Sequence, residues 1–210
     1  MSEELTSVGV VCRTDYFKRA RLSKEEMFLR ECRGMTPALS QRLPDLMPRE
    51  AVHAAANFSY RVMNYTGKGF LSIGDAHRFI DPIFAYGVYF GVQEAEFAAK
   101  AIARHLSGET KTKGNPFADY ERLCDEGNDV VEDVIGVLWE YPIAFQRIFT
   151  WRDRAAALDL LSGRIYGELG AANPARIAMR KLMATRERQL SARKTTTRPA
   201  SKPKLAMAAG

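Results

Sequence analysis

Residues 69 to 91 constrain the fold of this chain more than any other stretch, because a turn and a helix start follow each other within it. They read Gly-Phe-Leu-Ser-Ile-Gly-Asp-Ala-His-Arg-Phe-Ile-Asp-Pro-Ile-Phe-Ala-Tyr-Gly-Val-Tyr-Phe-Gly. Phe70 to Ile73 has three apolar side chains, which predicts a short strand that is buried on both faces. Gly74 then permits a sharp turn, so Asp75 is expected at the tip of that strand.

The residues after this tip predict a helix whose first turn lies beside the carboxylate of Asp75. Pro82 fixes its own φ and pushes Asp81 into an extended conformation. A helix is then expected from about Gly87 to Leu106. Because the N–H groups of a first helical turn favour negative charge, this region is a candidate ligand site.

Four segments, which follow each other along the chain in the order that the family has, resemble the FAD-dependent monooxygenase superfamily and above all the flavin-dependent halogenases. Gly74-Asp75 with its Pro-containing loop resembles the second flavin-binding motif of that superfamily. Residues 6–11 resemble the strand that follows the family's Trp-x-Trp-x-Ile-Pro segment. Residues 79–84 resemble its Phe-x-Asp-Pro-x-Phe loop, and residues 160–167 resemble its Leu-x-Gly-x-x-x-Gly segment. The resemblance covers about residues 6 to 170.

The resemblance implies a flavoprotein oxidoreductase that uses FAD, with Asp75 bonded to a ribityl hydroxyl. Reduced flavin would react with oxygen, and a small organic substrate would be oxidised, as in a monooxygenase, or halogenated. The electrons would come from NAD(P)H or from a flavin reductase. The implied cofactor-binding residues are Gly74, Asp75, Ala76, Asp81, Pro82, Ala85, Tyr86 and Gly87; the resemblance assigns no catalytic residue and no metal ligand.

One part of the resembled site differs in this chain. The halogenases have Ser or Thr in the stretch that supports the halide before the helix, whereas Ala85 and Tyr86 carry no small hydroxyl. Only backbone N–H groups, such as those of Ala85, Tyr86 and Gly87, are then left to hold an anion.

A Gly-x-Gly-x-x-Gly turn, which binds the pyrophosphate in such enzymes, does not occur in the 210 residues. The chain is therefore expected to be the C-terminal fragment of a larger protein. Its fold class would be α+β or α/β: a partial FAD-binding fold of the glutathione-reductase type without its N-terminal βαβ unit. The expected parts are a remnant of the substrate domain (1–65), the Gly-Asp segment and helix (66–110), a helical C-terminal region (111–190) and a disordered basic tail (191–210).

Two alternatives remain open. A reductase similar to geranylgeranyl reductases would share the Gly-Asp-Ala loop with its later Pro. A non-catalytic remnant would instead use the old flavin surface or the basic tail as an interaction module. The missing pyrophosphate turn favours this second alternative, because that turn supplies much of the anchoring of FAD.

Other residues are weaker candidates. His77 is expected either near the flavin phosphates or at the surface, and Arg61 and Arg78 are expected in surface ion pairs. Tyr65 is a possible substrate contact, and His53 and His105 have no partner at metal-ligand spacing. Five aromatic residues are expected to form core, with a substrate pocket as the alternative; they are Trp139, Tyr141, Phe145, Phe149 and Trp151.

Composition sets further bounds. The net charge of +6 is concentrated in residues 180–210, which hold nine Lys or Arg and one Glu. A solubilising tail is the preferred interpretation of this charge, so a nucleic-acid partner is not expected. Three widely spaced cysteines indicate a reducing cytoplasm, and no apolar run is long enough for a membrane span. Unpaired strand edges would allow self-association.

The remaining pattern predicts mostly helix. Strands are expected at 6–12 and 57–65, the latter joined to the strand at 70–73 by a turn at 66–69. Ser23 and Glu26 have the spacing of a helix-capping box. Further helices are expected at 36–43, at 115–139 up to the stop at Pro142, at 142–149, at 153–161 and from Asn173 to about Leu190.

Overall fold

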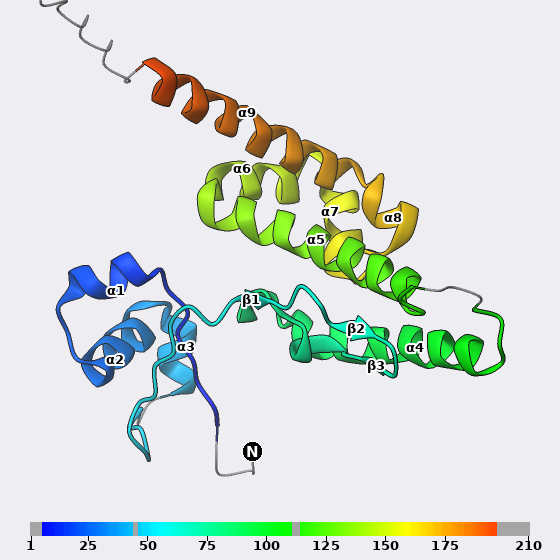
Figure 1. The fold of residues 1–210 in the computed structure, drawn as a ribbon. Helices are drawn as coiled ribbons and strands as arrows, with labels where there is room; N and C mark the ends of the chain where they lie inside the picture. Colours follow the sequence, from blue (N-terminus) through cyan, green and yellow to red (C-terminus); the bar gives the residue numbers. More distant parts are fainter. Residues whose placement is uncertain (1–5, 44–45, 111–113, 197–210) are drawn as a thin grey trace, which may run out of the picture. The chain divides into compact units, whose positions relative to one another are not determined.

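The computed structural model describes residues 6–43, 46–110 and 114–196, and these are mostly helical with two small sheets (Figure 1). The α-helices are α1 Thr14–Ala20, α2 Lys24–Gly34, α3 Pro37–Arg42, α4 Tyr86–Leu106, α5 Ala118–Glu140, α6 Pro142–Arg147, α7 Arg154–Leu161, α8 Gly167–Ala171 and α9 Pro174–Thr196. The strands are β1 Tyr60–Arg61, β2 Thr66–Gly67, β3 Phe70–Leu71 and β4 Arg78–Phe79. Two 3₁₀ turns, η1 Gly74–Ala76 and η2 Pro82–Phe84, and a π-helical turn, η3 Ile148–Arg152, complete the list.

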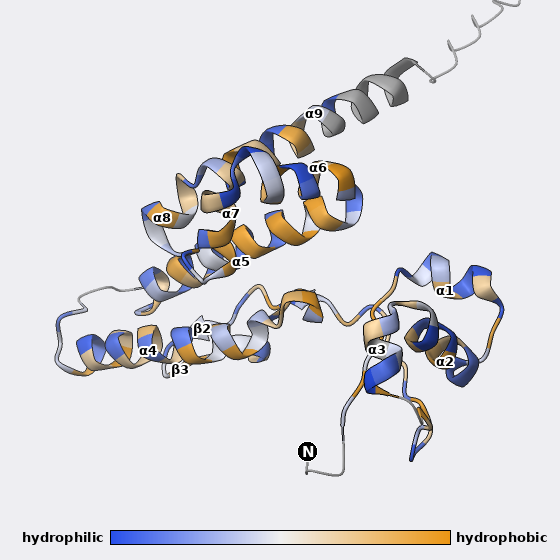
Figure 2. Cartoon of the chain, turned by 180° about the vertical axis from the view of Figure 1, so that it is seen from behind, coloured by the Kyte–Doolittle hydropathy of each residue, from blue (hydrophilic) through white to orange (hydrophobic). Residues whose placement is uncertain are grey.

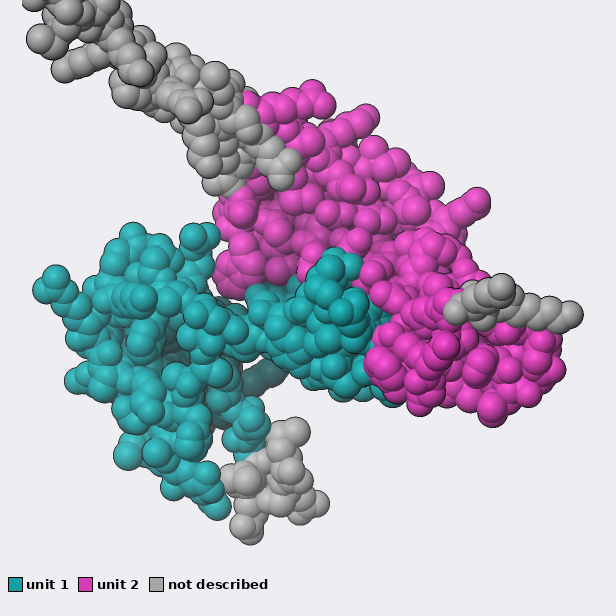
Figure 3. All heavy atoms as spheres, viewed as in Figure 1, with its two compact units in different colours: residues 1–65, 72–95 teal, residues 66–71, 96–210 magenta. Residues whose placement is uncertain are grey.

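The chain forms two compact units (Figure 3). Unit 1 consists of residues 1–65 and 72–95, and unit 2 of residues 66–71 and 96–210. The division falls within α4. The four-part division expected from the sequence stays a prediction.

The capping box at the start of α2 is confirmed. The Ser23 hydroxyl accepts the N–H of Glu26 at 3.2 Å, and the Ser23 N–H donates to Oε2 of Glu26 at 2.8 Å. Met27 and Cys32 are the buried residues of this helix. The signal was reliable because both hydrogen bonds form within four consecutive residues.

The prediction of a strand at 6–12 is wrong, because these residues have no regular secondary structure. The first element of the described chain is α1, which was not expected. Of the strand expected at 57–65, only β1 is present. It pairs antiparallel with β4, with Tyr60 opposite Phe79 and Arg61 opposite Arg78. A weak alternation of apolar residues forms a strand only where a ladder partner is available.

The expected turn is present only in part: Thr66 and Gly67 form β2, which pairs with β3 around a turn at Lys68 and Gly69, whereas the strand within 57–65 pairs with β4 and not with β3. The strand after it is shorter than expected and is not buried on both faces. Phe70 is 52% exposed and Ile73 is 37% exposed. Within unit 2, the Thr66 hydroxyl donates to Glu121 Oε2 at 2.7 Å.

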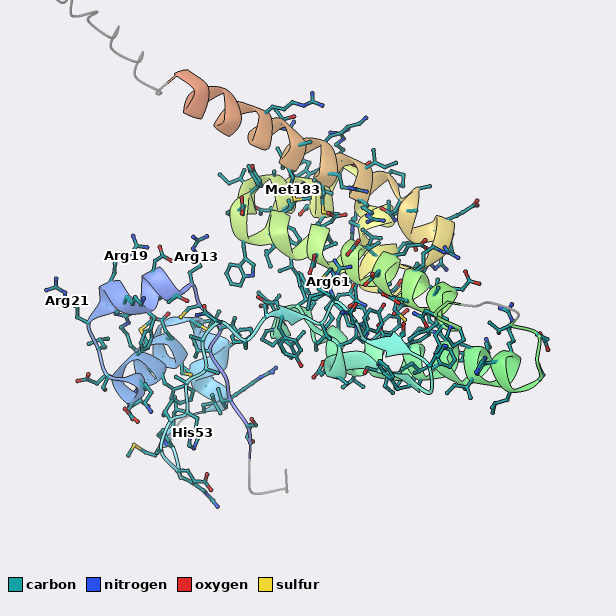
Figure 4. The ribbon with its side chains drawn as sticks, in the orientation of Figure 1. Arg13, Arg19, Arg21, His53, Arg61 and Met183 are labelled. Carbon is teal, nitrogen blue, oxygen red and sulfur yellow. The ribbon has the colours of Figure 1, made fainter. Side chains whose placement is uncertain are left out.

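Helix α5 carries the core of unit 2, and Figure 2 shows its apolar side in orange. Its valines are nearly fully buried: Val130, Val131, Val134 and Val137. Gly127 and Gly136 of α5 lie where other elements pack against the helix. A Cβ at Gly127 would come 2.2 Å from the ring of Tyr166, and one at Gly136 would lie 3.6 Å from Sδ of Met183 on α9 (Figure 4).

The helix boundaries after α5 follow the sequence closely. Pro142 starts α6 directly after the end of α5, as expected. Helix α9 extends to Thr196, beyond the expected end near Leu190. The rest of the expected disordered tail, residues 197–210, lies outside the described residues. None of the described helices is long and apolar enough to cross a membrane.

Candidate functional site

The centre of the site is the tight turn η1 in unit 1. Its Gly74 has φ +53, and a Cβ there would stand 3.1 Å from Cα of Gly91 on α4. The N–H groups of Ala76 and His77 bond back to Ile73 and Gly74, both at 3.1 Å. Position 74 therefore needs glycine for two reasons, its backbone conformation and its contact with the helix backbone.

Glu94 fixes this turn to α4 from within. The side chain is fully buried, and its Oε2 accepts the Gly74 N–H at 2.6 Å and lies 2.8 Å from Nε2 of His77. His77 is 1% exposed and stacks on Tyr65, with ring centroids 4.1 Å apart. Because Nδ1 of His77 is buried without a hydrogen-bond partner, the proton belongs on Nε2, where it is donated to Glu94.

Sequence analysis missed Glu94 and gave the wrong surroundings for His77, which lies neither at the surface nor at an open phosphate site. On α4, Ala95, Ala99 and Ile102 are exposed. The face that packs carries Gly91, Glu94 and Ala98. The spacing could have indicated the burial of Glu94, because a residue three positions after Gly91 and four before Ala98 lies on the same face of the helix as both.

The turn exposes Asp75 beside the first turn of α4. A Cβ at Gly87 would lie 3.4 Å from Oδ1 of Asp75, so the carboxylate lies against the helix start. The main-chain carbonyl of Asp75 accepts the hydroxyl of Tyr60. The backbone of this residue is thus held while its carboxylate faces solvent, which leaves the oxygens available to accept hydroxyl donors.

The loop before α4 is shaped by Asp81 and Pro82. The Asp81 carboxylate accepts the N–H of Ile83 at 2.9 Å, and Pro82 occupies the first position of η2. Ala85 follows with φ 54, and its N–H donates to Pro82 O at 3.0 Å. Of the three amides expected to face a ligand, that of Ala85 is thus used inside the loop. Gly87 belongs to the first turn of α4, where an N–H group has no acceptor within the helix.

Tyr86 anchors the start of α4 through its ring. The residue is 6% exposed and stacks on Phe90, with centroids 5.7 Å apart. Burial, with a smaller contribution from Tyr89, raises the pKa of Tyr86 to about 12. The phenol is therefore neutral at physiological pH. Ala76, Pro82, Ala85 and Gly87 are exposed, so the expected cofactor-binding residues form a mostly accessible surface around Asp75.

The expectation for Arg78 is wrong, because this residue is 2% exposed. It lies in β4 next to the buried His77, whereas its ladder partner Arg61 is exposed. Tyr65 is also buried, so it is not a surface contact for substrate. His105 packs on Phe117, and no group of three or more potential metal ligands occurs among the described residues.

The five aromatic residues of unit 2 are neither all core nor a closed pocket. Phe145 and Phe149 stack with centroids 4.1 Å apart, whereas Trp151 is 81% exposed. An open groove of about 560 Å³ lies over α6 and η3, lined by Ile143, Gln146, Arg147, Trp151 and Arg152.

Comparisons with known proteins give one consistent family. The chain is 34% identical over 146 residues to the 1H-pyrrole-2-carbonyl-[peptidyl-carrier protein] brominase of Pseudoalteromonas luteoviolacea, covering 69% of this chain and 35% of the brominase. It is 29% identical over 167 residues to the corresponding chlorinase of Pseudomonas fluorescens, covering 79% of this chain and 37% of the chlorinase. No family model matches the chain.

The comparison with solved structures indicates the same family. The solved structure of the flavin-dependent brominase Bmp2 matches with a TM-score of 0.69 and 30% identity, over 84% of this chain and 44% of the brominase. The chain is thus a member of the flavin-dependent halogenase family. It spans between a third and a half of the length of these relatives.

Proposed function

We propose that this chain is the C-terminal part of a flavin-dependent oxidoreductase that halogenates or oxidises a small organic substrate. The observation that carries the proposal is the position of Asp75. A turn held by Gly91 and Glu94 presents its carboxylate next to the start of α4. The family relationship supplies the cofactor, FAD, as the group that such a surface would bind.

The residues present fit one side of FAD. An exposed carboxylate suits the hydroxyls of a ribityl chain, and the Gly87 amide in the first turn of α4 suits the electron-rich edge of the ring. The pyrophosphate would need a Gly-x-Gly-x-x-Gly turn, a motif that the 210 residues do not contain. The proposed fold is accordingly a partial FAD-binding fold of the glutathione-reductase type.

Bound reduced flavin would supply the reaction with oxygen. The part of this chain in that chemistry is to hold and orient the cofactor: Asp75 accepts ribityl hydroxyls, and the loop from Asp81 to Ala85 positions the first turn of α4. Ala85 and Tyr86 carry no small hydroxyl that could hold an anion, and the Ala85 amide already donates to Pro82 O, which leaves oxidation open beside halogenation as the outcome.

The supporting comparisons do not favour a geranylgeranyl-reductase-like protein or a non-catalytic remnant. NAD(P)H or a flavin reductase as the electron source, and a cytoplasmic location, belong to the proposal. The three free cysteines agree with that location. Self-association belongs to it as well, because Val88, Val92 and Leu106 of α4 are 80%, 69% and 79% exposed.

The test is flavin binding by the purified chain, alone and mixed with the N-terminal part of the Pseudoalteromonas brominase. Quenching of FAD fluorescence measures the binding. The proposal predicts that the mixture retains FAD and that this chain is required for retention. A mixture that retains no more FAD than the brominase part alone would contradict it.

A further inference from the structure

The groove over α6 and η3 combines an exposed aromatic ring with two cations. Trp151 is 81% exposed and Ile143 is 83% exposed, so both project from unit 2 and do not line a closed cavity. Arg147 and Arg152 complete the lining together with Gln146, and no carboxylate lines the groove. Large exposed apolar side chains next to arginine are typical of protein-binding hot spots.

The local backbone explains why the tryptophan is presented in this way. η3 is a π-helical turn, closed by the Asp153 N–H bonding to Ile148 O at 3.2 Å. Ile148 is buried and anchors the turn, whereas Trp151 points to solvent. Single π turns within helices occur often at functional sites because they redirect side chains.

The charges indicate which partner fits. Among the described residues Arg147 makes no ion pair, so its charge is available to a partner. Arg152 is partly balanced, since its Nε lies 3.3 Å from Oδ2 of Asp153. This arrangement favours a partner that is acidic around an apolar contact.

A small-molecule ligand fits the groove less well. Sites for small molecules enclose most of the ligand surface, whereas the two largest apolar side chains here are more than four-fifths exposed. The partner is therefore expected to be a macromolecule that covers Trp151 and Ile143 from outside.

We propose that this groove docks a small acidic carrier protein that holds the substrate. The inference rests on the proposed function, because the two relatives compared above are named for a substrate carried by a peptidyl-carrier protein. Trp151 provides the apolar anchor, and Arg147 and Arg152 pair with carboxylates of the carrier protein.

The test uses the full 210-residue chain with Trp139→Phe, so that Trp151 is the one remaining tryptophan. A purified acidic peptidyl-carrier protein without its cargo is titrated in, and the emission of Trp151 is recorded at low and high salt. Docking predicts a blue shift that saturates and an affinity that falls as salt is added. The measurement needs no flavin, so it is independent of the test of FAD retention. The chain can retain FAD without binding the carrier protein, or bind the carrier protein without retaining FAD.

The deciding comparison is between two double charge reversals. Arg147→Glu with Arg152→Glu should weaken carrier binding by about tenfold or more. Lys18→Glu with Arg21→Glu, which makes the same charge change on and next to α1 (Figure 4), should leave binding within about twofold, since only general attraction changes. Circular dichroism checks that both variants stay folded.

Three results would overturn the proposal. The first is the absence of any spectral shift with the carrier protein. The second is equal weakening by both double variants. The third is a single-stranded oligonucleotide that binds as tightly as the carrier protein and with the same dependence on Arg147 and Arg152, which would make the groove a nucleic-acid surface.

Discussion

The N–H of Gly74 donates to the buried carboxylate of Glu94 at 2.6 Å, and this bond joins the Gly-Asp turn to helix α4. The same carboxylate oxygen lies 2.8 Å from Nε2 of His77. One side chain therefore holds both ends of the turn that presents Asp75. The predictions below test this arrangement and the packing that supports it.

Replacing Gly74 by Ala should destabilise unit 1 by about 1 to 3 kcal/mol, because alanine is strained at φ +53 and its methyl group would meet Gly91. Urea unfolding followed by circular dichroism measures the change. Trp139 and Trp151 both lie in unit 2, so tryptophan fluorescence reports that unit separately. Gly9→Ala is the matched control, since a Cβ there meets no atom within 4 Å. Equal stability of the two variants would contradict the packing described.

Replacing Glu94 by Leu should cost about 1 to 3 kcal/mol for each polar group left without an acceptor, here the Gly74 N–H and the His77 ring. Glu94→Gln keeps an acceptor oxygen and should lose less. Hydrogen exchange of the Gly74 amide, followed by NMR, measures the bond directly. Faster exchange in the Leu variant than in the Gln variant is expected; the same exchange rate in both would show that the bond does not hold the turn.

Stability should fall between pH 10 and 12 because of Tyr86. Its folded-state pKa of about 12 lies above the usual tyrosine pKa of 10.0, so the unfolded chain loses the proton first. The contribution is complete below pH 10 and disappears as the pH rises through 12. Thermal unfolding across this range should show a smaller decline for Tyr86→Phe. If the wild-type chain and the variant lose the same stability, the phenol is not buried as described.

The pair of Asp133 and Arg176 should matter to unit 2. Burial raises the pKa of Asp133, and the hydrogen bond from Arg176, 2.8 Å long, opposes this shift. Arg176→Met should therefore cost about 3 kcal/mol, because it leaves a poorly solvated carboxylate. Adding Asp133→Leu should recover part of the loss. Urea unfolding followed by tryptophan fluorescence measures both, and additive losses in the double variant would show that the two residues are not coupled.

Features determined by neighbouring residues could be predicted from the sequence. The capping box of α2, the turn at Lys68 and Gly69 and the stop at Pro142 each depend on a few adjacent residues. The order of Gly74, Asp75 and the helix start likewise predicted a turn beside an accessible carboxylate, which the structure contains.

Features that depend on distant partners could not be predicted. The strands at 6–12 and 57–65 were overestimated because strand formation depends on a ladder partner. The packing of Gly127 could not be predicted either, since the ring that lies against it belongs to the distant Tyr166. The burial of Glu94 and His77 was hidden because each side chain is hydrogen-bonded to the other, which lies 17 positions away in the sequence.

The most direct test of the account is the affinity for FAD of the chain combined with the N-terminal part of the Pseudoalteromonas brominase. The comparison is between the wild-type chain, Asp75→Ala and the exposed control Asp119→Ala. Loss of one charged hydrogen bond should weaken FAD binding by about 1.5 to 3 kcal/mol, or roughly tenfold to a hundredfold, in Asp75→Ala alone. An Asp75→Ala variant that binds FAD as tightly as Asp119→Ala would contradict the assignment of this carboxylate to the flavin site.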